Sequence, residues 1–251
     1  MLQQERQQGI LEFIEKQGRV YASQLSRQYQ VSEDTIRRDL DALAQQGVIQ
    51  RVHGGALAVD GGCNPLSERL KLITSEKQRI AQHAAQQISP QQIVLLDASS
   101  ICLELARQLP KDLAITVVTP CAPVATALAD HPNVELILLG GRVLKAAMVS
   151  LGESAIELLS TIRIDLCFMG VQAAHPETGL TLDSMEEAEL KRKMVSHSAE
   201  VIALAEAVKL ERTAPFSVAS VQQIDQLITD RSLNESLQRR YQQAGVPVST
   251  V

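Results

Sequence analysis

The sequence predicts an α/β protein in which an N-terminal winged helix-turn-helix is followed by a larger domain with a mostly parallel sheet. Three observations carry this prediction. Residues 1–57 have short helical patterns that end in a glycine-rich hairpin pattern. After residue 75, short apolar runs alternate with helical stretches, which is typical of a parallel sheet covered by helices. The chain has 251 residues and 45% apolar content, enough for one large core and a small second domain.

The first 57 residues have the pattern of three short helices and a hairpin. The first helix has an apolar stripe that ends before Gly18, and the stripe consists of Ile10, Leu11, Phe13 and Ile14. The second helix has apolar residues at i, i+3 and i+7, namely Ala22, Leu25 and Tyr29. Ser32 is the expected N-cap of the third, where Val31 and Ile36 can form a hydrophobic staple. "VIQRVHGGALAV" then predicts two strands that turn at Gly54-Gly55.

Residues 58–74 contain Gly-Gly and Asn-Pro and predict a linker, so that the larger domain covers 75–251. Apolar runs in this domain predict six strands, at 93–96, 114–118, 134–139, 165–169, 201–205 and 226–229. Helical patterns lie between most of them, at 75–88, 101–109, 121–130, 152–161, 186–198 and 234–244.

The third helix has the features of a DNA-reading helix. With Ile36 on the buried face, Arg38 lies opposite it, and Arg37 and Thr35 lie on the two flanks. Such a helix needs an apolar back and hydrogen-bond donors that reach the groove, and arginine can read guanine edges. The alternative is a solvated surface helix on which the two arginines pair with Asp34 and Asp41. The hairpin that follows favours the first interpretation, because Arg51 and His53 beside Gly54-Gly55 suit a wing on the sugar-phosphate backbone.

Composition limits the possible chemistry. The net charge is −5 and gives no support for binding nucleic acid by bulk attraction, so DNA binding would depend on where the arginines lie. The four cysteines are far apart and form no CxxC pair, which argues against a zinc site or a disulfide framework and favours reduced thiols in a cytoplasmic protein. The five histidines have no metal-ligand spacing, and we expect neither a metal nor a cofactor. No signal peptide and no membrane-spanning run is predicted.

The stretch "VSEDTIRRDLDALAQQGVIQRVHGGA" resembles the N-terminal signature of the DeoR family of bacterial transcriptional regulators. The resemblance implies double-stranded DNA as a partner, and it assigns DNA contacts to Ser32, Thr35, Arg37 and Arg38, with backbone support from Arg51 and His53. It continues more weakly to about Asp230. It implies a C-terminal domain related in fold to ribose-5-phosphate isomerase and CoA-transferase-type enzymes, which typically senses a phosphorylated sugar or a similar metabolite.

The residues themselves indicate where such a ligand would bind. "IVLLDASSI" is a buried strand that ends at Asp97, and Ser99 and Ser100 open the next helix. Ligands of open α/β sheets bind beyond the carboxyl ends of strands, and a helix N-terminus with hydroxyls favours an anion. Alternatively, the serines only cap the helix. In "LLGGR", Gly140 and Gly141 allow close backbone approach and Arg142 could meet a phosphate; a plain turn is the alternative.

The resemblance adds three positions and shows departures. It implies Lys209 at the ligand phosphate, Glu187 at ligand hydroxyls and Thr119 in the site. The alternatives are a surface lysine and a solvated charged helix. The family pattern Asp-x-Gly-Thr-Thr is replaced by Asp97-Ala98-Ser99-Ser100-Ile101, Thr-Asn-Ser by Thr119-Pro120-Cys121, and a common Asp by Glu206. These departures leave the ligand class open.

The sequence thus predicts a DNA-binding regulator, more often a repressor in this family, of carbohydrate genes that responds to a phosphorylated sugar and acts as a homo-oligomer. One rival is a sugar-phosphate isomerase or transferase with a fused DNA-binding domain, which would need a general base; Asp97 and Glu187 are the candidates. A second rival is a ligand-independent DNA-binding protein whose α/β domain only oligomerises. We expect regulation and no enzymatic activity.

Overall fold

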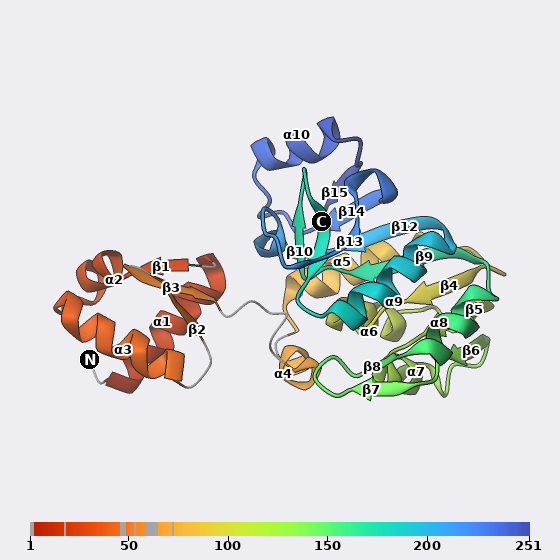
Figure 1. Cartoon of the computed structure of the whole chain (residues 1–251), viewed down its shortest axis with the longest axis horizontal. Coiled ribbons are helices and arrows are strands. Elements are labelled where there is room, and N and C mark those ends of the chain that lie inside the picture. The colour runs from red at the N-terminus through yellow and green to blue at the C-terminus, as the bar shows by residue number, and fades with distance from the viewer. Residues whose placement is uncertain (1–2, 18, 46–48, 53, 59–64, 72) are drawn as a thin grey trace. The chain divides into compact units, whose positions relative to one another are not determined.

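The computed structural model describes residues 3–17, 19–45, 49–52, 54–58, 65–71 and 73–251. They form two compact units, Met1–Asn64 and Pro65–Val251, shown from red-orange to blue in Figure 1. The predicted combination of a small helical domain and a larger α/β domain is confirmed. None of the described helices is long and apolar enough to cross a membrane.

The first unit is a winged helix-turn-helix. Its order is α1 (Gln3–Gln17), β1 (Arg19–Tyr21), α2 (Ala22–Tyr29), α3 (Glu33–Gln45), β2 (Ile49–Val52) and β3 (Gly55–Ala58). The three helices and the hairpin agree with the prediction, whereas β1 was not predicted. It pairs antiparallel with β3, giving the strand order β1-β3-β2. Gly55 permits this pairing, because a Cβ there would lie 2.0 Å from the carbonyl oxygen of Val20.

The core of this unit comes from the apolar stripes of its helices, including Ile10, Leu25, Ile36 and Leu40. Ser32 caps α3 as predicted, since its hydroxyl accepts the backbone N–H of Thr35 at 3.2 Å.

The second unit contains a seven-stranded sheet in which all strands are parallel. The order is β15-β14-β12-β9-β4-β5-β6. The strands are β4 (Ile93–Leu96), β5 (Ile115–Thr119), β6 (Val134–Leu138), β9 (Ile164–Gly170), β12 (Ser198–Leu204), β14 (Gln226–Thr229) and β15 (Val248–Thr250). The six predicted strands are confirmed; the short edge strand β15 was missed.

The helices between the strands also agree with the prediction to within a few residues. They are α5 (Ser75–Ala85), α6 (Ser100–Arg107), α7 (Ala122–Leu128), α8 (Glu153–Ser160), α9 (Met185–Ser196) and α10 (Glu235–Gln243). Short elements were missed, namely β7 (Arg142–Leu144), β8 (Val149–Leu151), β10 (Ala173–His175), β11 (Gly179–Leu182), β13 (Phe216–Ala219) and the 3-10 turns η1 (Ala207–Lys209) and η2 (Val221–Gln223). The five strands among them form a two-stranded sheet, β7-β8, and a three-stranded antiparallel sheet, β10-β11-β13, beside the main one.

The chain reverses direction across the sheet between β4 and β9. From β4 it proceeds outward through β5 and β6, and then it returns to the other side of β4 and proceeds outward through β9, β12 and β14. Right-handed crossovers place the helices of the two halves on opposite faces. The carboxyl ends of β4 and β9 therefore border the crevice where ligands of open α/β sheets bind.

The expected linker at 58–74 is too long at its C-terminal end. It contains helix α4 (Leu66–Lys71), which belongs to the second unit. Leu66 is fully buried in the core of that unit, and its N–H donates to the carbonyl oxygen of Ala146 at 2.6 Å. Glycine and proline residues predict the linker, but Leu66 is buried in the core of the second unit, and α4 packs against α6. Residues 59–64 lie outside the described residues.

Candidate functional site

Helix α3 presents its basic side chains to solvent. The Arg37 and Arg38 side chains are 58% and 81% exposed, while Ile36 on the opposite face is fully buried. Each arginine pairs within the helix, Arg37 with Glu33 at 3.7 Å and Arg38 with Asp34 at 3.1 Å. Exposed i,i+4 pairs contribute only about 0.3–0.5 kcal/mol, so the guanidinium groups can exchange these carboxylates for DNA at little cost.

The wing is attached to α3 through Arg51. Its Nε donates to Asp41 at 2.6 Å, and a second guanidinium N–H donates to the carbonyl oxygen of Gly55. Asp41 therefore pairs with Arg51 and not with Arg37 or Arg38. This position gives Arg51 a structural role between helix and hairpin, and its contact with the DNA backbone stays a prediction. His53 lies outside the described residues.

A buried ion pair occupies the crevice of the α/β unit. The carboxylate of Asp97, directly after β4, lies 2.7 Å from Nζ of Lys191 on α9. Both side chains are almost fully buried, at 0% and 6% exposure. Gly170 at the end of β9 joins them, since its N–H donates to Asp97 at 3.0 Å and its carbonyl accepts from Lys191 at 2.8 Å. A side chain at position 170 is excluded, because its Cβ would lie 2.2 Å from Cβ of Ser99.

Further charged groups surround this pair. Glu187, one turn before Lys191 on α9, lies 3.7 Å from its Nζ. Burial raises the pKa of Glu187, which Lys191 opposes. Burial acts to lower the pKa of Lys191, but Asp97 and Glu187 outweigh it and raise that pKa, so Lys191 is protonated.

Lys209, in the turn after β12, lies at the same edge of the sheet. Its Nζ donates to the carbonyl oxygen of Val171 at 3.1 Å, the residue next to Gly170. Burial lowers the pKa of Lys209 to about 8; Glu206 opposes this shift, whereas Arg69 and Lys77 add to it. The charge of Lys209 is therefore poorly compensated, which is what a site for an anion requires.

Among its described residues, this cluster has four cationic side chains and three carboxylates. The cations are Arg69, Lys77, Lys191 and Lys209, and the carboxylates are Asp97, Glu187 and Glu206. Two buried polar atoms among them, Nε of Arg69 and Oδ1 of Asp97, make no hydrogen bond. Buried polar atoms are nearly always paired, so unpaired donors and acceptors together mark a place where polar groups of a ligand can bind.

The serines after Asp97 have a structural use. Ser99 caps α6 by accepting the N–H of Cys102 at 3.0 Å, and both Ser99 and Ser100 are buried. Thr119 is fully buried; its hydroxyl donates to the carbonyl of Leu96 and accepts the N–H of Cys121. Thr119 thus holds the turn after β5. Ligand contacts of these three residues stay predictions.

Gly140 and Gly141 connect β6 to the β7–β8 hairpin, and Arg142 is the first residue of β7. Gly141 has a φ of +139°, and a Cβ there would meet the carbonyl oxygen of Leu151 at 2.4 Å, so its close approach is to the hairpin itself. A Cβ at Gly140 would meet nothing within 4 Å, and a ligand contact of either glycine stays a prediction. Arg142 is exposed and pairs with Glu186 at the start of α9, next to Glu187. A ligand contact of Arg142 also stays a prediction.

The structure thus brings together Asp97, Glu187 and Lys209, which the sequence singled out from separate segments. Lys191 and Arg69 were missed. Lys191 lies one turn after Glu187, and this i,i+4 spacing was a signal that could have found it. Arg69 was assigned to the linker, and no local pattern connects it with the site.

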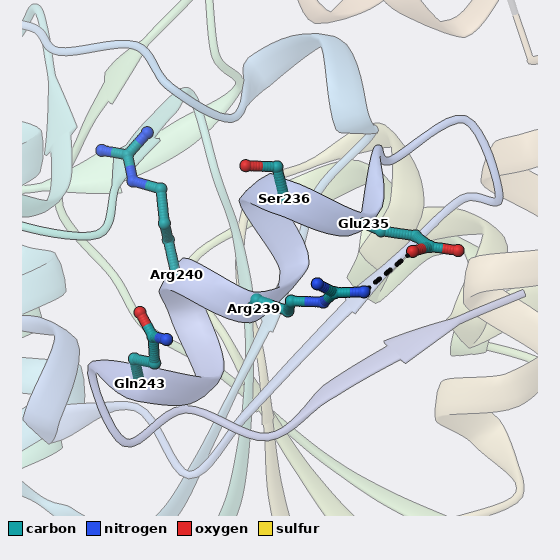
Figure 2. A pocket seen from close by; sticks show the side chains of 5 residues that line it. All are labelled: Glu235, Ser236, Arg239, Arg240 and Gln243. Carbon is teal, nitrogen blue, oxygen red and sulfur yellow. Dashed lines mark hydrogen bonds and ion pairs between the residues drawn. The ribbon is translucent and has the colours of Figure 1, made fainter.

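Apart from this cluster, the structure has a pocket on the surface of α10 (Figure 2). Glu235, Ser236, Arg239, Arg240 and Gln243 line it, all from one helix. Arg239 pairs with Glu235 across one turn, and Arg240 pairs with Glu211. Both arginines thus have carboxylate partners, and none of the predicted site residues lies among the lining residues.

The described cysteines show no sign of reactivity. Cys102, Cys121 and Cys167 are buried free thiols, and burial raises the pKa of Cys102 to about 12 and that of Cys121 to about 11. The described residues contain no group of three or more side chains that could hold a metal ion.

Known protein families match both units of the chain. Residues 6–61 match the model of the DeoR-like helix-turn-helix domain, and residues 73–231 match that of the DeoR C terminal sensor domain. The HTH-type transcriptional regulator GolR of Listeria innocua is 35% identical over 246 residues, which cover 97% of this chain and 97% of that protein.

The glycerol-3-phosphate regulon repressor of Escherichia coli is 30% identical over 231 residues, which cover 92% of each chain. Among solved structures, ribose 5-phosphate isomerase A of Methanocaldococcus jannaschii aligns at a TM-score of 0.39 and 15% identity, over 57% of this chain and 55% of that one.

Proposed function

The chain belongs to the DeoR family of transcriptional regulators, and we propose that it is a repressor released from its operator by an anionic metabolite, with a sugar phosphate as the favoured class. Its relatives are named regulators, which supports regulation over enzymatic catalysis. The name of the Escherichia coli relative, a glycerol-3-phosphate regulon repressor, supports both the repression and the phosphorylated effector. Binding to chromosomal DNA would place the protein in the cytoplasm.

The excess positive charge in the crevice between β4 and β9 carries the effector proposal. A phosphate dianion next to Lys209 and Arg69 would compensate the charges that burial leaves unbalanced. Asp97 and Glu187 would accept hydrogen bonds from the hydroxyls of the same ligand, because Oδ1 of Asp97 is unpaired and Glu187 is close by on α9. Cationic and carboxylate groups side by side fit a ligand with a phosphate at one end and hydroxyls at the other.

For the operator, we propose that α3 enters the major groove and that the side chains of Arg37, Arg38 and Thr35 face the base edges. Ser32 would keep the helix start in place while its hydroxyl remains near that of Thr35, at 2.9 Å. Arg51 would act by holding the wing in position.

Coupling between the sites would require at least a dimer. Two winged helices in one dimer gain effective concentration and read an inverted repeat. We propose that the α/β unit supplies the interface. The large apolar side chains of this unit that remain exposed are Leu138, Val143, Leu158, Met185 and Val208, and such an interface would cover some of them.

A thermal-shift screen of phosphorylated sugars, each beside its unphosphorylated counterpart, tests the effector. A ligand at 100 times its Kd raises the stability by about 2.7 kcal/mol. We expect one or a few phosphorylated sugars to raise the melting temperature, and the same compounds to release operator DNA in gel shifts. Stabilisation by neutral sugars only, or by none of the panel, would contradict the proposal.

The same panel of phosphorylated sugars also tests whether the protein is an enzyme. Glu187 combines burial with a raised pKa, the property expected of a general base, but Lys191 lies 3.7 Å away and opposes its protonation. We expect NMR spectra of each sugar phosphate to stay unchanged after long incubation with the protein. Isomerised product that appears with wild type and not with Glu187→Gln would show an enzyme.

A further inference from the structure

Arg69 connects the candidate effector site with the start of the α/β unit. It lies on α4 (Leu66–Lys71), the first helix after residues 59–64. This short helix is held at its beginning, where the N–H of Leu66 donates to the carbonyl oxygen of Ala146 and Leu66 is buried. The helix also packs against α6, the helix that Ser99 caps beside Asp97.

The guanidinium of Arg69 interacts electrostatically with the charged groups of the crevice. Burial lowers the pKa of Arg69, and the charges of Glu187 and Asp97 oppose this shift. In turn, the positive charge of Arg69 helps to lower the pKa of Lys209. The guanidinium nevertheless stays charged, because arginine is not deprotonated in proteins.

The other cations of the cluster have assigned partners. Lys191 binds Asp97 and the carbonyl of Gly170, Lys209 binds the carbonyl of Val171, and Lys77 pairs with Glu206 at 3.7 Å. Nε of Arg69 is buried and makes no hydrogen bond within the described residues. A guanidinium presents its N–H groups as a planar fork that matches phosphate, so an anion that replaces the missing partner would bind Arg69 with high geometric specificity.

We propose that Arg69 binds the anionic group of the effector and thereby couples effector occupancy to helix α4 and to the chain that leads from it to the DNA-binding unit. This inference rests on the proposed function of the crevice as an effector site. Without an anion, α4 carries a buried charge that is poorly compensated. With one, the same charge becomes the contact that holds α4 against the site.

Three variants test the proposal. Arg69→Gln removes the charge at similar length, and Arg69→Lys keeps the charge but loses the fork. Arg79→Gln is the matched control, because Arg79 lies on the next helix, is exposed and pairs only locally with Glu76 at 3.3 Å. The probes are inorganic phosphate and the phosphorylated sugar that stabilises wild type most. Calorimetry measures their affinity, gel shifts measure operator affinity with the sugar phosphate at saturation, and hydrogen exchange reports on the amides of residues 66–71.

We expect Arg69→Gln to weaken both probes at least tenfold, Arg69→Lys to weaken them less, and Arg79→Gln to leave them unchanged. At saturating ligand, wild type should release the operator and exchange the α4 amides more slowly, and Arg69→Gln should do neither. Unchanged affinity in Arg69→Gln and Arg69→Lys would remove Arg69 from the site.

Weaker affinity with full release and full protection at saturation would leave Arg69 as a binding residue and overturn the coupling. A wild type that binds no phosphorylated probe would instead refute the proposed function, and this inference with it.

Discussion

At the scale of single residues, Asp97 and Lys191 form the most deeply buried ion pair among the described residues of the α/β unit. Oδ2 of Asp97 binds Nζ of Lys191 and the N–H of Gly170, and the carbonyl of Gly170 accepts from Lys191, whereas Oδ1 of Asp97 makes no hydrogen bond. Removing one partner of such a pair leaves an uncompensated charge, and this costs more than the intact pair contributes to stability. The pair therefore orders the crevice: it holds the ends of β4 and β9 and the middle of α9 in register with one another.

Replacing Lys191 with Met should lower the free energy of unfolding of the α/β unit by about 3–5 kcal/mol, because Asp97 then stays buried without its cation. Urea denaturation followed by circular dichroism measures this. The double variant with Asp97→Asn should recover part of the loss, since the unpaired negative charge is gone. A single variant as stable as wild type would show that the pair does not order the site.

Lys209 should make effector binding dependent on pH. Its pKa of about 8 means that at pH 8.5 the amine is about three quarters neutral in the free protein. An anion beside it favours the charged form and raises this pKa, so binding at pH 8.5 should take up a proton and affinity should fall between pH 7.5 and 9.

Calorimetry in two buffers of different ionisation enthalpy measures the proton uptake. In Lys209→Met the uptake should disappear, and affinity should be lower by about 1.5–3 kcal/mol at pH 7.5 through the loss of one charge-assisted contact. Equal affinity and equal uptake in both proteins would place Lys209 outside the site.

At the scale of elements, α3 has two faces with different tasks. One face holds the helix in the domain through Ile36, Leu40 and the buried carboxylate of Asp39, whereas the other carries the exposed arginines. Substitutions on the two faces should therefore separate DNA binding from stability.

Arg37→Ala and Arg38→Ala should each weaken operator binding by about 1–3 kcal/mol if they read bases, without change in the melting temperature. Gel-shift titration with a selected operator measures the affinity. Arg239→Ala is a matched control, because Arg239 forms the same exposed i,i+4 pair, 3.1 Å from Glu235, on α10. Wild-type affinity in both α3 variants would favour a solvated helix over a recognition helix.

Asp39 should be required for the stability of the winged helix. Its carboxylate is buried and accepts from Nε of Arg6 on α1 at 2.5 Å and from Gln7 at 3.3 Å. Asp39→Ala leaves Arg6 buried without its anion, which typically costs about 3–5 kcal/mol. A domain of this size has little more stability than that.

Calorimetric scanning of Asp39→Ala should thus show the DNA-binding unit unfolded at 37 °C and the transition of the α/β unit unchanged. Asp41→Ala, which removes an exposed partner of Arg51, should have a much smaller effect. Two intact transitions in Asp39→Ala would contradict the role of this pair.

At the scale of the whole molecule, the net charge of the chain favours the proposed dimer. With a net charge of −5, a single chain has little non-specific attraction for DNA, which comes mostly from released counterions. Two recognition helices in the proposed dimer would compensate for this weakness. We expect light scattering to give at least twice the chain mass of 27.4 kDa at micromolar concentration. Leu138→Asp and Met185→Asp should lower that mass if the exposed apolar side chains form the interface. A monomer that binds a single operator tightly would contradict the dimer.

The sequence by itself determined the elements and their type, because these depend on neighbouring residues. The stripe of Ile36, Leu40 and Leu43 predicts α3, and Ser32 predicts its start, since the cap bonds to an N–H only three residues away. The uniformly apolar runs predict buried parallel strands for the same local reason. The short strands β1 and β15 escaped prediction because three residues have too little pattern and form only by pairing with a distant partner.

Only the tertiary structure decided which charges meet. Asp97, Gly170, Lys191 and Lys209 come from separate segments, and the reversal of strand order between β4 and β9 brings them to one edge of the sheet. The sequence singled out Asp97, Glu187 and Lys209 as separate candidates, but not the pairing of Asp97 with Lys191. Arg69 shows the limit most clearly. Its segment adjoins the predicted linker, and only the packing of α4 through the buried Leu66 brings Arg69 within the electrostatic influence of Glu187 and Asp97. Periodicity records which face of an element is buried, and it carries no information about which distant charge lies opposite.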